Sequence, residues 1–215
     1  MYPSEPWDLR GQLYLSLFAV DRRALAPLPP VLAAAVRPVT LAGRALVGAA
    51  WVSYEPGGVL QYRELLAAVL VHERGRPRIS ITEIWVDSVA SRDGGRALWG
   101  IPKELAHLAL RPNTGGGLAA TAGSIATAVF RAGRRLPGRW PASLLVAQER
   151  DAVLCRTPVR ARAGLRVGGA TWRVEPAGPL GYLAGRRPLL TVTLTDFRLR
   201  FGAGTPAPQG AHGRS

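Results

Sequence analysis

The segment from Asp87 to Ala106 reads DSVASRDGGRALWGIPKELA and is the most informative stretch of the chain. Asp87-Ser88 can begin a short helix, and we expect the pair Gly94-Gly95 to end it. Beyond that pair, Lys103 directly follows Pro102 in an apolar frame made by Leu98, Trp99, Ile101 and Leu105. An ionisable amine in an apolar setting makes this segment the first place to look for chemistry.

Lys103 also stands out in the composition. The chain has 215 residues with 28 basic side chains, and every basic residue except Lys103 is an arginine. If position 103 only needed a solvated charge, a chain that uses arginine elsewhere would be expected to use it here too. A guanidinium stays protonated and is a poor nucleophile, whereas a primary amine can add to a carbonyl group. The lone lysine therefore indicates imine chemistry, with chance as the alternative.

The formal net charge of +14 at first suggests a nucleic-acid partner. The arginines, however, occur singly or in pairs along the whole chain, without a block of five or more basic residues. A composition rich in Ala, Gly, Pro and Arg is typical of a GC-rich genome. We therefore disfavour nucleic-acid binding despite the charge, and expect the charge mainly to raise affinity for anions.

The remaining composition is that of a globular chain, with 47% hydrophobic and 20% charged residues. Cys155 is the only cysteine, so no intrachain disulfide can form, and a cytoplasmic protein with a buried, inert thiol is the simpler interpretation. The apolar runs are much shorter than the roughly 18 residues of a membrane span, so no membrane association is expected.

The hydrophobic pattern predicts mainly strands. Leu13, Leu15 and Leu17 alternate with polar or aromatic residues, and Asp21 can cap a helical stretch that reaches Val36. Further strand-like segments are 45–54, 60–72, 79–86, 118–130, 143–148, 152–159, 170–174 and 189–199. This pattern predicts a mainly β (α+β) fold, an antiparallel β-barrel with a few short helices. We expect one domain over residues 1–201 and a disordered tail over 202–215, which lacks large apolar residues.

Common catalytic and metal-binding motifs are missing from the sequence. It contains no G-x-S-x-G, Gly-Lys P-loop, H-E-x-x-H or C-x-x-C motif. The three histidines, His72, His107 and His212, are far apart in the chain, so a metal site is not expected.

The run Gly95-Arg-Ala-Leu-Trp-Gly-Ile-Pro-Lys103 resembles a family signature, the G-R-x-x-x-G-x-P-K of the acetoacetate decarboxylase superfamily. In that family the lysine forms a Schiff base. Upstream, Trp85-Val86-Asp87-Ser88 resembles the strand that precedes the signature, and Tyr62-Arg63-Glu64 resembles a Tyr-x-Glu whose glutamate points into the active site. The landmarks cover roughly residues 10 to 110, and they imply an acetoacetate decarboxylase-like fold.

The resemblance also implies an activity and a set of roles. Lys103 would be the nucleophile on a small β-keto or oxo acid, and Glu64 would orient substrate or move protons. Arg10 would anchor a carboxylate, and Arg96 and Trp99 would bind substrate. The iminium supplies the electron sink, so neither a cofactor nor a metal is implied. Relatives are commonly oligomeric, so a homo-oligomer is expected.

Three departures from the family pattern leave the reaction open. Glu104 replaces a second lysine, Ala49 stands near the position of a second carboxylate, and Ala97 replaces a glutamate. Decarboxylation and aldolase or dehydratase chemistry both remain possible outcomes. The alternative is a degenerate member that binds a small acid or a protein partner without turnover. Glu104 can face away from Lys103, because successive side chains of an extended segment point in opposite directions.

For each of the other site residues a structural role is the alternative. Glu64 could lie on an exposed strand face and Arg10 could be an exposed terminal charge. Arg96 could pair with Asp87 or Asp93 to hold the loop, and Trp99 could be core or pocket wall.

Overall fold

The computed structural model describes residues 1–113, 117–202 and 205–206, and most of these residues lie in β-strands. The strands are β1 (Trp7–Asp21), β2 (Arg37–Pro38), β3 (Thr40–Leu41), β4 (Arg44–Tyr54), β5 (Tyr62–Glu73), β6 (Arg76–Val86), β7 (Lys103–Leu105), β8 (Leu108–Pro112), β9 (Leu118–Ala122), β10 (Ala126–Arg150), β11 (Val153–Val174), β12 (Leu190–Phe201) and β13 (Thr205–Pro206). The helices are α1 (Pro30–Ala35) and α2 (Val89–Trp99), with 3-10 turns η1 (Arg22–Ala24) and η2 (Gly181–Leu183). The prediction of a mainly β fold with few helices is confirmed.

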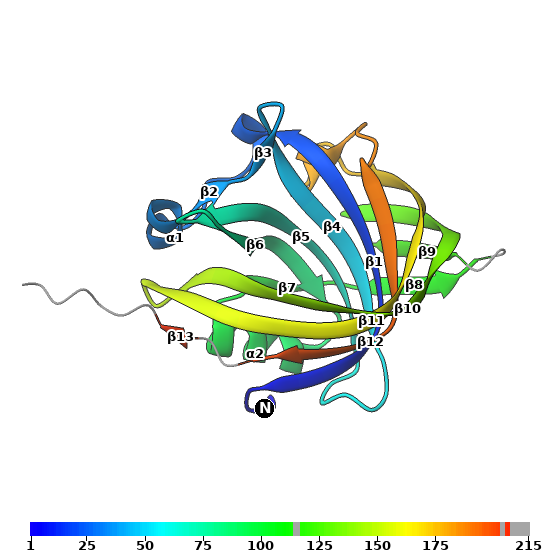
Figure 1. Ribbon diagram of the computed structural model, residues 1–215, viewed down its shortest axis with the longest axis horizontal. Coiled ribbons are helices and arrows are strands. Elements are labelled where there is room, and N and C mark those ends of the chain that lie inside the picture. Colours follow the sequence, from blue (N-terminus) through cyan, green and yellow to red (C-terminus); the bar gives the residue numbers. More distant parts are fainter. Residues whose placement is uncertain (114–116, 203–204, 207–215) are drawn as a thin grey trace, which may run out of the picture.

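All the strands belong to one sheet that closes on itself (Figure 1). Neighbouring strands follow the order β11-β12-β1-β4-β5-β6-β10, and an additional pairing of β10 with β11 completes a ring. The pairings are antiparallel except for β6 with β7 and β6 with β10. The β6–β10 contact is short, with Ile79 opposite Val146, so the ring is joined there by a single described residue pair.

The second half of the chain forms longer strands than the sequence predicts. The segments expected at 143–148, 152–159 and 170–174 are parts of β10 and β11, which pair with each other from Ala126–Val174 to Arg150–Val153. Register shifts between Arg131 and Arg134, and between Leu136 and Trp140, absorb the residues that break the local pattern. The expectation of short separate strands was wrong because pairing with a long partner, rather than local propensity, sets strand length here.

The helices also differ from the predicted ones. Asp21 caps only η1, where its Oδ1 accepts a hydrogen bond of 2.9 Å from the backbone N–H of Arg23. Prolines interrupt the rest of the stretch, and α1 starts separately with Pro30 at its first turn. In the segment 87–106, α2 continues through Gly94-Gly95 and is capped by Gly100, whose φ of 66° is left-handed. The prediction that the glycine pair ends this helix was therefore wrong.

Two apolar clusters form on opposite faces of the sheet. On β4 and β5, Trp51 and Leu65 belong to the first cluster, whereas their neighbours Val52 and Leu66 belong to or pack against the second. This alternation follows from the two-residue period of a strand. The second cluster includes Trp99 of α2 and Ile101, so α2 covers that face of the sheet.

The structure also bears on the single cysteine, on membrane-spanning helices and on the C-terminal tail. Cys155 is a free, buried thiol on β11. In residues 1–113, 117–202 and 205–206, no helix is long and apolar enough to cross a membrane. Most of the expected tail 202–215 lies outside the described residues; from that tail, Thr205–Pro206 pair with Cys155 and Arg156 as β13.

Candidate active site

Lys103 is the first residue of the short strand β7, and its side chain packs against α2. It lies opposite Ile84 in the parallel β6–β7 pairing, and only 4% of its surface is exposed. Its alkyl chain runs against Gly95 of α2, where an added Cβ atom would lie 2.7 Å from the Lys103 Cδ. Gly95 thus supplies room for the lysine, and the helix continues through it.

The Lys103 ammonium has three hydrogen-bond acceptors around it. Its Nζ donates to the Glu64 Oε2 and the Ser91 Oγ, both at 2.9 Å, and to the Tyr62 hydroxyl at 3.3 Å. The Nζ also lies 5.0 Å from the centre of the Tyr62 ring. An ammonium group has three N–H donors, so this arrangement satisfies all of them.

Glu64 is the only acidic partner of that ammonium among the described residues, and 3% of its surface is exposed. Its other oxygen, Oε1, accepts a hydrogen bond of 3.1 Å from the Tyr54 hydroxyl. Tyr54 stacks on Tyr62 with ring centres 4.3 Å apart. Burial raises the pKa of Tyr54, and it raises the pKa of Tyr62 to about 12, so both phenols are neutral at physiological pH.

The protonation of Lys103 depends on a balance between burial and its partners. Burial alone would lower the pKa of the amine, but the nearby Glu64 carboxylate and the Tyr62 hydroxyl outweigh it and raise that pKa above the ordinary 10.5. The resting site is therefore a buried ion pair between an ammonium and a carboxylate. A nucleophilic amine appears only when the proton leaves Nζ, and Glu64 is the adjacent acceptor.

Arg96 binds the backbone of Lys103 and pairs with the exposed Glu104. Arg96 Nε donates a 2.6 Å hydrogen bond to the carbonyl oxygen of Lys103, and its Nη2 pairs with the exposed Glu104 carboxylate. Glu104 therefore faces away from the amine, as the alternation of an extended segment predicts. Through these contacts Arg96 positions the main chain of Lys103, and it pairs with neither Asp87 nor Asp93 among the described ion pairs.

Trp99 belongs to the second apolar cluster, which also contains Tyr62. Its indole is 2% exposed and its Nε1 donates a 2.7 Å hydrogen bond to Glu5 Oε2. The ring contacts Trp7 edge-on, with centres 4.8 Å apart, and Phe201 at 4.5 Å. These contacts fix the end of α2 on the sheet.

Arg10 lies on a different face from the amine. The continuous β1–β4–β5 register places Leu13, Val52 and Glu64 in one row and therefore on one face. Arg10 has the opposite parity to Leu13 along β1, so it projects from the other face, where it is exposed and lies against Gly57. Ala49 is likewise on the face opposite Glu64, fully buried in the first cluster.

The structure adds two residues that the sequence does not single out, Tyr54 and Ser91, and it gives a contact with the amine to Tyr62, which the sequence names only as part of the Tyr-x-Glu motif. Tyr62 precedes Glu64 by two residues on a strand, so the period of two already places both on one face. Tyr54 requires the β4–β5 register and Ser91 requires the packing of α2, and neither is visible from local spacing. Within the described ranges, His, Cys, Asp and Glu side chains form no group of three that could hold a metal ion.

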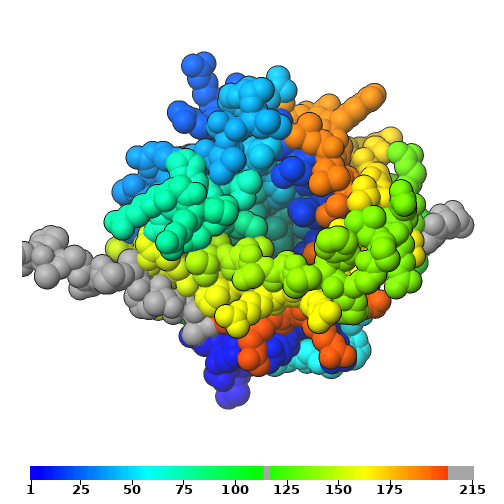
Figure 2. Space-filling view, viewed as in Figure 1, coloured from blue at the N-terminus to red at the C-terminus, as the bar shows by residue number. Residues whose placement is uncertain are grey.

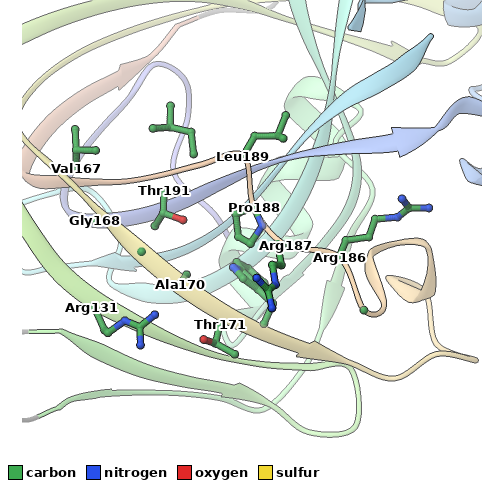
Figure 3. Close-up of a pocket in the computed structure, with 14 residues that line it drawn as sticks. Arg131, Val167, Gly168, Ala170, Thr171, Arg186, Arg187, Pro188, Leu189 and Thr191 are labelled. Carbon is green, nitrogen blue, oxygen red and sulfur yellow. The ribbon is translucent and has the colours of Figure 1, made fainter. Parts of the chain in front are cut away.

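A cavity of about 750 Å³ lies elsewhere, lined mainly by residues 167–172 of β11 and by the segment 185–191 (Figure 3). Arg131, Trp172, Arg187 and Thr191 are among its lining residues, and Lys103 and Glu64 are not. Figure 3 shows Arg131 and Arg187 along this cavity, whereas Arg186 extends away from the other labelled residues. Its residues lack a nucleophile beside a base, so the buried Lys103–Glu64 pair is the stronger candidate site.

Fold and site together define a class of protein, a ring-shaped β-sheet with a buried lysine paired to a glutamate beneath a glycine-containing helix. The sequence matches the family described as "Acetoacetate decarboxylase (ADC)" over residues 10–156. The chain therefore belongs to the acetoacetate decarboxylase family. No curated protein sequence matches it significantly.

Solved structures share this fold at low sequence identity. The acetoacetate decarboxylase of Legionella pneumophila is 19% identical with a TM-score of 0.75, covering 96% of this chain and 88% of that one. The enduracididine biosynthesis enzyme MppR, complexed with pyruvate, is 17% identical with a TM-score of 0.70, covering 96% and 91%. An acetoacetate decarboxylase-like enzyme from Sphingomonas wittichii is 18% identical with a TM-score of 0.63, covering 95% and 93%.

Proposed function

We propose that this protein is a Schiff-base-forming lyase that acts on a small β-keto or oxo acid. The observation that carries the proposal is the buried contact of 2.9 Å between the Lys103 Nζ and the Glu64 Oε2. A buried amine beside a buried proton acceptor is what covalent catalysis by a lysine requires. Acetoacetate decarboxylase is an established example of an enzyme with an activated lysine.

The proposed reaction begins with transfer of a proton from the Lys103 ammonium to Glu64. The neutral Nζ adds to the substrate ketone and forms a carbinolamine, and a proton returned by Glu64 lets hydroxide leave as water. The resulting iminium accepts the electron pair of the breaking carbon–carbon bond, which gives an enamine and releases carbon dioxide. From a β-hydroxy oxo acid, the same cleavage releases an aldehyde, and the Glu64 carboxylate takes the proton of the β-hydroxyl group. Protonation of the enamine and hydrolysis of the imine then restore the lysine.

The other contacts of the site have positioning roles in this scheme. Ser91 and Tyr62 fix the direction of Nζ, and Tyr54 holds the second oxygen of Glu64. We also propose that Arg96 acts on the reaction only through the Lys103 main chain, and that Trp99 acts as a rigid wall. We do not propose a direct contact between Arg10 and a substrate held at Lys103, because the Arg10 side chain projects from the opposite face of the sheet.

The relatives support an oxo-acid substrate. MppR is described in complex with pyruvate, and also with the condensation product of pyruvate and imidazole 4-carboxaldehyde. These ligands belong to that protein, and they make pyruvate the first compound to try here. β-Keto acids such as acetoacetate are the second class to try, because decarboxylation is the other outcome that an iminium permits.

The proposal is tested by borohydride trapping with a panel of keto acids, followed by intact mass measurement. We expect one reduced adduct per chain with at least one acid, and its loss in Lys103→Arg. The chain has a single lysine, so any adduct in that variant would come from the N-terminal amine. If no acid in the panel gave a Lys103-dependent adduct, the proposed covalent step would be contradicted.

A second candidate function is binding of a small acid without turnover. It is favoured by the raised pKa of Lys103, which keeps the amine protonated, and by Glu104 in place of a second lysine. In that case Lys103→Arg would keep its affinity for the acid, because a guanidinium preserves the positive charge. Proton NMR of the keto acid distinguishes the two functions, since only an enzyme converts it to product.

A further inference from the structure

Three arginines lie side by side across neighbouring strands of the sheet. Arg10 of β1 is directly opposite Arg198 of β12, and Arg198 is directly opposite Arg162 of β11. We call these three residues the arginine row. Residues opposite each other in a sheet project from the same face, so three exposed guanidinium groups share one surface. Figure 2 shows the orange-red end of β12 beside the blue start of β1 on that lower edge of the molecule.

A second line of arginines runs two residues further along the same strands. Arg200 and Arg160 are opposite each other, and Arg200 also lies opposite Asp8. Asp8 accepts two hydrogen bonds from Arg200, at 2.8 and 2.7 Å, so that guanidinium is neutralised. Across the described part of the chain, no carboxylate forms an ion pair with Arg160 or with any member of the arginine row.

Two cavities meet at the arginine row. One has a volume of about 370 Å³ and is also lined by Arg160 and Arg200. The other has a volume of about 610 Å³ and is also lined by Arg139. All three members of the row line both cavities. A ligand bound here would therefore contact several guanidinium groups at once.

The arginine row places like charges next to one another, and the neighbouring residues that the structure describes do not neutralise them. Like charges directly opposite each other on neighbouring strands destabilise a sheet. Gly57 has a φ of 91°, and a Cβ atom there would lie 2.8 Å from the Arg10 Nη1, so glycine leaves room for that side chain. Glu55 and Asp196 line the larger cavity, and Asp196 Oδ1 already accepts a hydrogen bond from Gln12.

We propose that the arginine row binds a small ligand that carries two or three linked phosphate groups. Arginine forks match phosphate oxygens two at a time, and several forks on one surface favour clustered anionic groups over a single carboxylate. Strand spacing and residue rise give the patch a size of about 10 by 7 Å, which suits a short phosphate chain rather than a long polyanion. Parity along β1 places the row on the face of the strand opposite that of the Lys103–Glu64 pair, so this site is separate from the proposed active site.

The test measures binding of inorganic triphosphate and of ATP by isothermal titration calorimetry at low and physiological salt. The test variant is R10Q/R162Q/R198Q, and the matched control is R134Q/R135Q/R166Q, which removes the same charge and includes the opposed pair Arg135–Arg166. We expect one site per chain in the wild type and in the control, and binding at least about tenfold weaker in the test variant. Circular dichroism verifies that each variant is folded.

The outcomes separate the ligand sources. Equal affinity for triphosphate and ATP supports a site for phosphate groups alone, and tighter binding of ATP supports one that also contacts a nucleoside. Equal losses in the two triple variants would show only general attraction of anions to a basic chain, and would overturn the proposal. It would also be overturned if neither compound bound at millimolar concentration while a DNA duplex did.

Discussion

At the scale of single residues, the chemistry of the candidate site rests on one buried ion pair. Burial favours a neutral Lys103 amine, whereas Glu64 favours the charged form, and the carboxylate prevails. The same carboxylate that holds the ammonium is placed to remove its proton. Under the proposed function, Glu64 would both set the resting charge of Lys103 and accept its proton.

Substitution of Glu64 should change the protonation of Lys103 in a known direction. In Glu64→Gln the carboxylate is lost and burial remains, so we expect the pKa of the amine to fall below its ordinary 10.5, whereas the wild-type value lies above it. Because Lys103 is the only lysine, protein labelled with ¹⁵N at the lysine Nζ gives one signal to titrate by NMR. Turnover should fall by about 100-fold or more, since proton transfer is lost.

Glu104→Gln is the matched control for that titration. It removes a carboxylate from the next residue, but this one is exposed and paired with Arg96. We expect the Nζ signal to titrate as in the wild type. A Glu64→Gln signal that stays charged above pH 10.5 would contradict the assigned balance.

Gly95→Ala should disturb the lysine while leaving the helix intact. The new Cβ would lie 2.7 Å from Lys103 Cδ and 2.8 Å from Cε, so the side chain must move away from its three acceptors. Alanine is the better helix former by about 1 kcal/mol, so α2 should not unfold. We expect borohydride trapping with the best keto acid to fall by about tenfold or more.

Gly94→Ala tests whether that effect is specific. Its Cβ would lie 2.5 Å from Trp7 Cζ2, so the strain falls on the packing of the indole and not on Lys103. This variant should lose thermal stability and keep its trapping yield. Equal trapping by wild type and Gly95→Ala would show that the close approach of the glycine is not needed.

At the scale of elements, α2 and β7 act together as the support of the site. The helix begins at Ser88, whose Oγ accepts a 3.2 Å hydrogen bond from the Ser91 N–H, and ends at the left-handed Gly100. An added Cβ at Gly100 would lie 2.4 Å from the Glu149 carbonyl oxygen, so a larger residue fits neither the dihedral angle nor the space. The two caps therefore define where Ser91 and Gly95 meet Lys103.

Loss of the N-terminal cap should lower stability modestly. Ser88→Ala removes the acceptor for the Ser91 N–H, at a cost of about 1 kcal/mol in unfolding free energy. For a chain of this size that corresponds to a fall of about 2–4 °C in melting temperature, measured by circular dichroism. Ser143→Ala, at an exposed position of β10, is the control and should leave the melting temperature unchanged. If Ser88→Ala had the melting temperature of the wild type, water would have to replace the Ser88 hydroxyl as the acceptor for the Ser91 N–H.

At the scale of the whole molecule, charged side chains link strands that are distant in sequence. Glu73 at the end of β5 accepts hydrogen bonds at 2.9 and 3.0 Å from Arg156 Nε of β11, and one at 3.3 Å from Arg78 of β6. Glu73 is 8% exposed, so these bonds are largely shielded from solvent. The cluster connects strands on both sides of β10 and so supports closure of the ring.

The Glu73 cluster should make stability depend on acid pH. Hydrogen bonding to Arg156 lowers the pKa of Glu73 below its ordinary 4.5. The stabilisation is therefore fully present above pH 4.5 and is lost as the pH falls through the lowered pKa. We expect Glu73→Gln to cost about 2 kcal/mol at neutral pH, with the difference from wild type shrinking in acid.

Urea denaturation at a series of pH values measures that difference. Glu175→Gln, which alters an exposed carboxylate, is the control and should follow the wild type throughout. A Glu73→Gln deficit that persists unchanged below the lowered pKa would show that the loss comes from packing and not from charge.

The local hydrophobic pattern of the sequence predicted where many of the strands lie but not how long they are. Segments 45–54, 60–72 and 79–86 coincide with β4, β5 and β6, because a two-residue period is a property of neighbouring side chains. The full lengths of β10 and β11 were missed, since Gly133 and Pro137 look like breaks until a partner strand absorbs them in register shifts. The path of α2 through Gly94-Gly95 was missed because that glycine pair is chosen for space, which spacing in a sequence does not reveal.

The sequence by itself determined the strand pattern, the family and the identity of its one amine, because these depend on residue type and short-range order. Only the tertiary structure decided what surrounds that amine. Glu64 and Lys103 are 39 residues apart, and their contact needs both the β5–β6 pairing and the placement of β7 beside β6. The tertiary structure likewise separates Arg10 from the amine and aligns it with Arg162 and Arg198. Burial sets the charge state of Lys103, and long-range strand register sets the neighbours of Lys103 and Arg10. Both exist only once the chain is folded.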